Sequence, residues 1–173
     1  MAGDLDRDPR VRLVTVGFEP LDPPAVLAAV GDRAGGGNVL FVGTVRDVTG
    51  AVATARLEYE AHPPLALAEF ARLCREAADR FGLIAVAVSH RLGVVEPGDA
   101  SVAVAASAAH RRQAFAAAEW LMEQIKATVP IWKCDHAPDG GRTWVHGDRT
   151  AVTRPAAQEK PPGAIRGDDT SHP

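Results

Sequence analysis

The stretch PPLALAEFARLCREAADRFG, Pro63–Gly82, is the clearest structural element in the sequence. It opens with two prolines, which a helix tolerates in its first turn. Its apolar residues recur at alternating steps of three and four, the spacing of one helix face. These residues are Leu67, Phe70, Cys74, Ala77 and Phe81. The stretch therefore predicts a long amphipathic helix, and Cys74, which falls on the apolar stripe, is assigned a structural role.

Strands are predicted on both sides of this helix. After it, Leu83–Leu92 and Ser101–Ser107 are separated by VVEPGDA, whose Pro-Gly-Asp favours a turn, so we expect an antiparallel pair. Before it, NVLFVGTVRD predicts a buried strand that ends at Arg46. A turn around Asp47–Gly50 leads to a second strand near Ala53–Glu60, which predicts a hairpin.

A second long helix is predicted to begin after Ser107, a good N-cap residue, and to end at Pro130. One of its faces is apolar and consists of Phe115, Ala118, Met122 and Ile125. The segments IWK and RTWV, on either side of the loop HAPDGG, predict two short final strands. A short helix is predicted near the start of the chain, over Pro23–Val30, followed by a loop with three consecutive glycines.

The order of elements indicates the fold class. Helices are inserted between hairpins, which predicts an α+β fold with an antiparallel, hairpin-built sheet and two long amphipathic helices. We expect one folded domain over residues 11–150 and a flexible N-terminus over 1–10. Residues 151–173 mix Pro, Gly and charges without periodicity, so we expect a disordered tail there.

Composition narrows the possible partners. The formal net charge is -3, so the chain lacks the basic excess that nucleic-acid binding requires, and we expect a small ligand held by a local cluster. No apolar run reaches the length of a membrane span, and the first residues form no signal region, which predicts a soluble cytoplasmic protein. The two cysteines, Cys74 and Cys134, show neither disulfide-framework nor zinc-site spacing, which fits a reducing compartment.

The segment AAHRRQAF places His110, Arg111 and Arg112 in the first turn of the second long helix. Cations there oppose the positive end of the helix dipole, at a cost of a few tenths to about 1 kcal/mol each, unless an anion lies between them. Backbone N–H groups at a helix start also bind anions. Three basic residues together at a helix start therefore favour a phosphate or carboxylate site. The simpler alternative is that all three side chains point into solvent and bind nothing.

Lysine is rare in this chain, because Lys126, Lys133 and Lys160 are the only lysines among 19 basic Lys and Arg residues. An ammonium group can exchange a proton or act as a nucleophile, which a guanidinium does not. The alternative is that Lys126 suits the end of a helix and Lys133 is a solvated strand residue. Cys134, beside Lys133, is a minor candidate nucleophile, because adjacent strand residues face opposite ways.

Four segments, FVGTVRD, HRLGVVEPGD, AAHRRQAF and KATVPIWK, together resemble the large catalytic subunit of molybdopterin synthase, and the match runs from about Val39 to Val145. The resemblance implies a hammerhead-like fold and a sulfurtransferase without metal or cofactor. Two sulfurs would pass to cyclic pyranopterin monophosphate, which forms the molybdopterin dithiolene of molybdenum cofactor biosynthesis. The donor would be a small ubiquitin-like subunit whose C-terminus is a thiocarboxylate.

The resemblance also implies roles for particular residues. Lys126 matches the family's essential lysine, and Lys133 matches its second active-site lysine. Arg46, with Thr44 and Val45 before it, matches a substrate-binding segment. The family further implies a homodimer of large subunits with a small subunit at each end, a heterotetramer whose sites borrow residues across the dimer interface.

Further candidates follow from the same comparison. His110 and Arg111 match the pair that helps to bind the pterin phosphate, in agreement with the anion site inferred above. Asp135 stands where relatives have Glu, and it is a candidate to orient Lys133 or touch the pterin. Cys134 is a further candidate for substrate binding. Arg149 matches a family arginine only after a shift of one residue and is not assigned.

Two other functions remain open at this stage. A non-catalytic subunit that binds a phosphorylated metabolite or a ubiquitin-like tail needs the basic cluster but no titrating lysine. A sulfurtransferase that carries a persulfide on Cys134 needs a reactive thiol.

Overall fold

The computed structural model describes residues 8–49 and 52–146. Most of the N-terminal segment 1–10, the tail 151–173, Arg149 and Lys160 lie outside the described residues, as does part of the turn at Asp47–Gly50. The predicted boundaries of the folded domain therefore remain a prediction. Among the described residues, no helix is long and apolar enough to cross a membrane.

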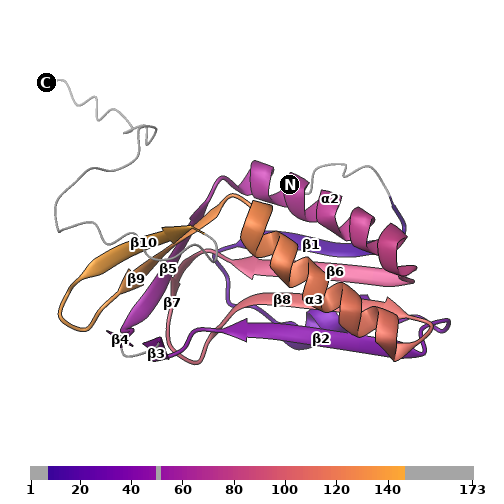
Figure 1. Cartoon of the computed structure of the whole chain (residues 1–173), viewed down its shortest axis with the longest axis horizontal. Coiled ribbons are helices and arrows are strands. Elements are labelled where there is room, and N and C mark those ends of the chain that lie inside the picture. Colours follow the sequence, from indigo (N-terminus) through magenta and orange to yellow (C-terminus); the bar gives the residue numbers. More distant parts are fainter. Residues whose placement is uncertain (1–7, 50–51, 147–173) are drawn as a thin grey trace, which may run out of the picture.

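The larger sheet has the strand order β1-β6-β8-β2 (Figure 1). Its strands are β1 (Val11–Gly17), β2 (Gly37–Thr44), β6 (Ala85–Arg91) and β8 (Ala100–Ala108). β6 pairs with β8 antiparallel, as predicted, and β8 pairs with β2 antiparallel. β1 pairs with β6 in parallel, and no strand was predicted over its residues. The α+β class is confirmed, with one parallel pair in a mainly antiparallel structure.

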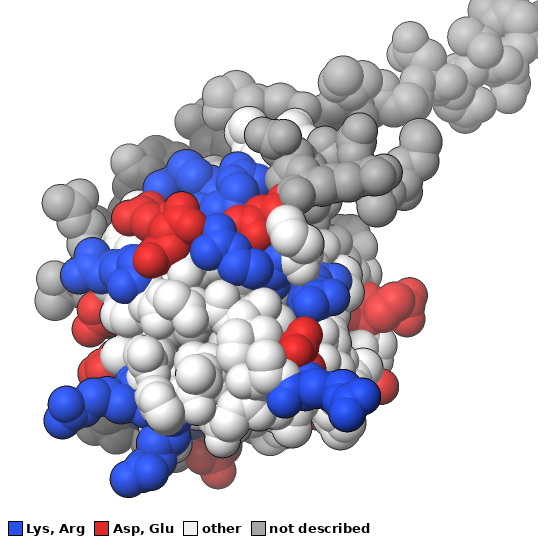
Figure 2. Space-filling view, turned by 90° about the vertical axis from the view of Figure 1, so that its right-hand side faces the viewer, with Lys and Arg blue, Asp and Glu red and all other residues white. Residues whose placement is uncertain are grey.

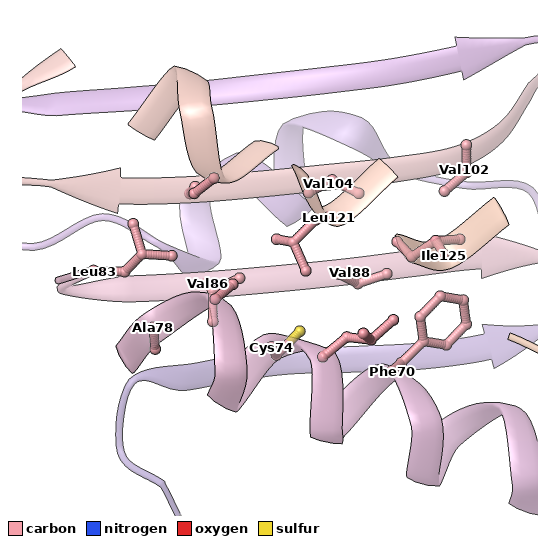
Figure 3. Close-up of a cluster of buried hydrophobic side chains, with 14 of the residues drawn as sticks. Phe70, Cys74, Ala78, Leu83, Val86, Val88, Val102, Val104, Leu121 and Ile125 are labelled. Atoms are coloured by element: carbon pink, nitrogen blue, oxygen red, sulfur yellow. The ribbon is translucent and has the colours of Figure 1, made fainter. Parts of the chain in front are cut away.

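Two long helices cover one face of this sheet. They are α2 (Pro63–Phe81), which lies along β1 and β6, and α3 (Arg111–Thr128), which lies over β8 and β2 (Figure 1). Val86, Val88, Val102 and Val104 point from the strands into the helices, where they meet Phe70 and Leu121 as part of the main core (Figure 3). Burying each such side chain stabilises the fold by about 1.5–3 kcal/mol.

A short helix, α1 (Pro23–Ala29), covers the opposite face, as the sequence predicts. Because side chains alternate along a strand, the residues between the core valines face this helix. They are alanines, Ala85 and Ala87 on β6 and Ala103 and Ala105 on β8. Val26 and Val30 of the α1 region pack against them. Small side chains on this face let a helix of only two turns lie close to the sheet.

A second sheet has the order β10-β9-β5-β7 and is entirely antiparallel. It is formed by β5 (Arg56–Ala61), β7 (Gly93–Val95), β9 (Ile131–His136) and β10 (Arg142–His146). The two predicted final strands are confirmed as β9 and β10. A separate short ribbon joins β3 (Val48–Thr49) and β4 (Val52–Ala53).

The predicted hairpin between the strand ending at Arg46 and the strand near Ala53–Glu60 is wrong. Those segments form β2 and β5, which lie in different sheets. The chain leaves the first sheet at Val45, which is buried and whose N–H donates to the Asp99 carbonyl at 3.0 Å. β2 pairs with β8 instead. The eight paired residues of this ladder stabilise β2 more than a local turn would. Only the tip of the expected hairpin forms, as β3 and β4.

The two long helices match the sequence in different degrees. α2 buries Phe70, Cys74 and Ala77 as predicted. The prediction of Ser107 as the N-cap residue of α3 is wrong, because β8 continues to Ala108 and Ser107 lies buried inside it; the N-cap residue is His110.

The apolar face predicted for α3 is also partly wrong. Phe115 is 62% exposed, and the buried residues of this helix are Ala114, Ala117, Ala118, Leu121 and Ile125. Alanines allow the helix to approach the sheet closely, so the large Phe115 ring points away from it. Ala118 and Ile125 are buried as predicted, and Met122 packs at the margin of the core.

Candidate active site

Lys126 and Lys133 lie at the same end of the molecule, where α3 passes into β9 (Figure 1). Lys126 is exposed in the last turn of α3, and Lys133 is half-buried on β9. The connection between them is short and fixed. Val129 is buried and donates to the Ile125 carbonyl at 3.1 Å, and Ile131 donates to the Val129 carbonyl at 2.8 Å. The two rare lysines are therefore held in a defined relation by the backbone.

β9 is an inner strand, so its two faces are set by the ladders on either side. Lys133 lies opposite Tyr59 of β5, and Asp135 lies opposite Leu57. Directly opposite residues share a face of the sheet, and so do residues two apart on one strand. Lys133, Asp135, Tyr59 and Leu57 therefore lie on one face. Cys134 points to the other face, away from Lys133, as the sequence analysis expected.

The segment Thr44–Arg46 reaches the same region through Val45. Its side chain is buried in a small cluster with Leu57 and Val95, against which Tyr59 packs. Thr44 and Arg46, on either side of Val45, are exposed. The buried residue therefore fixes the segment against the Lys133 face while the polar side chains stay available to a ligand.

His110 and Arg111 lie at the other end of α3. His110 is the N-cap residue, and both side chains are exposed. Lys126 follows Arg111 by fifteen positions on this helix, a span of about 22 Å at the helical rise. Figure 2 shows the end of the molecule where α3 begins, with Lys and Arg side chains around a largely uncharged centre. Within one copy, the predicted site residues thus fall into two separate groups.

Gly36 and Gly37, where the chain enters β2, lie close to the start of α3. The Gly36 N–H donates to the Ala108 carbonyl at 3.0 Å. A Cβ atom on Gly37 would lie 2.9 Å from both the N and Cα atoms of Arg111, closer than real Cβ contacts come. Because only glycine permits this approach, the loop places its backbone directly against the first residue of the helix.

Cys134 is poorly suited to nucleophilic chemistry. It is buried, and its Sγ lies 3.9 Å from the Asp135 carbonyl oxygen. Burial raises the pKa of the thiol, and a hydrogen bond to Arg142 only partly opposes this. The reactive form of cysteine is the thiolate, which a raised pKa disfavours.

Sequence reasoning missed the aromatic group behind the Lys133 face. His90 is buried between Tyr59, whose ring is 5.1 Å away edge to face, and Phe70, whose ring is stacked at 6.3 Å. Burial lowers the pKa of His90 to about 4, with the Arg91 carbonyl hydrogen bond opposing, so the ring is neutral near pH 7. Burial also raises the pKa of Tyr59. The only signal in the sequence was that Tyr59 is its single tyrosine.

In the described part of the chain, no three His, Cys, Asp or Glu side chains come together in a way that could hold a metal ion.

Solved structures of similar fold define the class of protein. Molybdopterin synthase from Staphylococcus aureus superposes with a TM-score of 0.71 at 34% identity, covering 75% of this chain and 94% of that one. A complex of subunits 1 and 2 of molybdopterin-converting factor from Helicobacter pylori, with 24% identity and a TM-score of 0.60, shares the fold. The class is that of molybdopterin-synthase-like α+β proteins.

The MoaE protein family model matches residues 16–128. The chain therefore belongs to the MoaE protein family. A molybdopterin synthase catalytic subunit from Emericella nidulans is 41% identical over 127 residues, which cover 73% of this chain. One from Pyrococcus abyssi is 39% identical over 123 residues, which cover 71% of this chain and 82% of that protein. The match spans 65% of the Emericella protein, slightly less than two thirds of its length.

Proposed function

We propose that this chain is the catalytic subunit of a molybdopterin synthase. It transfers two sulfurs from the C-terminal thiocarboxylate of a small ubiquitin-like subunit to cyclic pyranopterin monophosphate, which forms the molybdopterin dithiolene. The observation that carries the proposal is that the elements bearing Lys126, Lys133 and the Thr44–Arg46 segment lie at one end of a MoaE-family fold. Two buried thiols accord with a reducing cytoplasm.

Each transfer has two stages. The thiocarboxylate sulfur attacks a carbon of the pterin side chain, which forms a new carbon–sulfur bond while the carbon–oxygen bond at that carbon breaks and the oxygen leaves on the phosphate or as water. Water then cleaves the bond between that sulfur and the acyl carbon of the partner, which leaves sulfur on the pterin and a carboxylate on the partner. A second loaded partner supplies the second sulfur. Negative charge develops on oxygen in both stages, and nearby cations stabilise it most strongly when water is excluded.

The lysines fit this chemistry better than arginines. Lys126, in the exposed last turn of α3, is the group assigned to meet the acyl end of the partner and to give or take a proton. Lys133 is half-buried, and Asp135 shares its face of β9 and acts to orient it. Arg46 holds the substrate through charge. Cys134 takes no part in sulfur transfer, because it lies on the opposite face with a protonated thiol.

The proposal includes a homodimer with a composite site, to which each copy contributes one end of α3. A two-fold axis near the middle of α3 would bring His110 and Arg111 of one copy to the Lys126 end of the other. Two features support this arrangement. β2 is an edge strand of its sheet, and Phe41 on β2 and Phe115 on α3 are large exposed aromatic residues. A hydrophobic edge of this kind is a common site of association. A small subunit at each end completes a heterotetramer.

A single-turnover assay tests the proposal. Thiocarboxylated small subunit and cyclic pyranopterin monophosphate are mixed with wild type, Lys126→Arg and Cys134→Ser, and dithiolene formation is followed. We expect wild type and Cys134→Ser to form product at similar rates and Lys126→Arg to be slower by roughly 100-fold or more. Lys126→Arg keeps the positive charge. A lower rate in this variant therefore indicates a role for Lys126 in proton transfer and not only in binding through charge.

Two outcomes would contradict the proposal. No product from wild type with a competent partner points to a binding subunit without catalysis. Loss of product only in Cys134→Ser places the transferred sulfur on the protein itself, as a persulfide.

A further inference from the structure

Tyr59 of β5 lies next to the site but is not one of the residues that the proposed function uses. On one side it is directly opposite Lys133 of β9, a relation that places the two Cβ atoms roughly 5 Å apart. On the other side it is opposite Gly93 of β7, which has no side chain. The Lys133 side chain therefore has the tyrosine ring as its immediate neighbour on β5.

The Tyr59 ring is fixed from behind by the main core. It packs edge to face on His90, with ring centroids 5.1 Å apart and an angle of 75° between the planes. His90 is itself held by a hydrogen bond between Nδ1 and the Arg91 carbonyl at 2.8 Å and stacks on Phe70, which is fully buried. The chain of rings Phe70, His90 and Tyr59 connects α2, β6 and β5.

Tyr59 also contacts the second part of the site. It packs against the cluster that contains Val45, the buried residue between Thr44 and Arg46. Ser101, which donates to the Gly43 carbonyl at 3.3 Å, also forms a hydrogen bond with Tyr59. One side chain thus lies between the strand that carries Lys133 and the segment that carries Arg46.

We propose that Tyr59 is a positioning residue, whose ring sets the Lys133 side chain relative to the Thr44–Arg46 segment. The inference rests on the proposed function, since it assigns a task within that site. The contribution of the ring is steric, because His90 holds it in one orientation. The hydroxyl group contributes less, since it bonds to Ser101 and not to the lysine. A misplacement of about 1 Å in a site can lower a rate by about 100-fold.

Two substitutions at Tyr59 and one matched control separate positioning from general stability. Tyr59→Phe keeps the ring, and Tyr59→Leu removes it. Trp144→Leu removes an aromatic ring from the same sheet, but Trp144 lies opposite Cys134 and so on the face away from Lys133. In the single-turnover assay, we expect Tyr59→Leu to be slower by about tenfold or more, Tyr59→Phe to remain within about threefold of wild type, and Trp144→Leu to match wild type.

Affinity for the small subunit, measured separately by titration, should be unchanged in all three variants, because Tyr59 acts on the rate of transfer. Equal rates for Tyr59→Leu and Trp144→Leu would overturn the proposal.

A second measurement needs no activity and no variant at Tyr59. Because Tyr59 is the only tyrosine, ring-labelled tyrosine gives a single set of NMR signals. We expect these signals to move in Lys133→Met and to stay in place in Trp144→Leu. Signals that do not respond to Lys133→Met would overturn the positioning role even if wild type proved to be inactive. Inactive wild type with responsive signals would instead overturn the proposed function alone.

Discussion

Arg111 and Lys126 lie on one helix but at its opposite ends, about 22 Å apart. Both are exposed. To touch both within one copy of the chain, a ligand would have to reach along most of the length of α3. The proposed composite site, with one residue from each of two copies, removes this requirement.

Mixing two inactive variants tests this consequence. Arg111→Ala and Lys126→Ala homodimers should each be strongly impaired, because every composite site lacks one group. After the two are mixed and allowed to exchange subunits, half of the dimers are mixed, and each mixed dimer has one intact site. Roughly a quarter of wild-type activity should therefore return. If both residues served one site within a copy, mixing would restore nothing.

The contact between Gly37 and Arg111 predicts a stability effect. Gly37→Ala adds a methyl group 2.9 Å from backbone atoms at the start of α3, and overpacking of this kind costs about 1–3 kcal/mol. Gly17→Ala is the matched control, because a Cβ atom there meets nothing within 4 Å. We expect that variant to stay within about 0.5 kcal/mol of wild type in urea unfolding. Equal stability of the two variants would show that the loop can move away from α3.

His90 predicts a pH dependence of stability. Its pKa is about 4 in the folded protein, mainly because of burial, against 6.5 as the ordinary value. Between those two values the unfolded chain binds more protons than the folded one, so the free energy of unfolding falls as the pH falls from about 6.5 to 4. The loss is on the order of 3 kcal/mol.

Urea unfolding at pH 7 and pH 4 measures this loss. His90→Phe keeps a ring between Tyr59 and Phe70 but cannot titrate, so it should lose less stability than wild type over this range. His62→Gln, at an exposed histidine before α2, controls for the loss of any histidine and should behave as wild type. An equal loss in wild type and His90→Phe would mean that His90 is protonated without cost in the fold.

Local patterns in the sequence were sufficient for the long helices and for β6, β8, β9 and β10. The apolar spacing that buries Phe70 and Cys74 is a property of α2 alone, and the turn signal between β6 and β8 lies within their connection. Pairing at a distance was not predictable in this way. The sequence near Asp47–Gly50 favours a turn, but β2 forms its backbone hydrogen bonds with β8, more than fifty residues away.

The candidate site likewise has features that local sequence patterns predict and features that only the three-dimensional structure shows. An anion site at His110 and Arg111 was predicted from charges at a helix start, and the structure places both residues at the exposed start of α3. Cys134 was correctly placed on the face away from Lys133. The separation of Arg111 from Lys126 required the length and direction of α3. Tyr59 was missed because its importance comes from Lys133 on a strand more than seventy residues later, a relation that no local pattern contains.

The parallel pairing of β1 with β6 has a consequence for synthesis of the chain. Val11 lies opposite Val86, so β1 has no strand partner until β6 has been synthesised, well after β1 itself. Until β6 has emerged, the apolar residues of β1 have no sheet to join, and such long-range pairing slows folding. During translation β1 therefore remains unpaired while β2, β5 and α2 are made, and α1, which follows β1 directly in the chain, is the nearest element that contacts it.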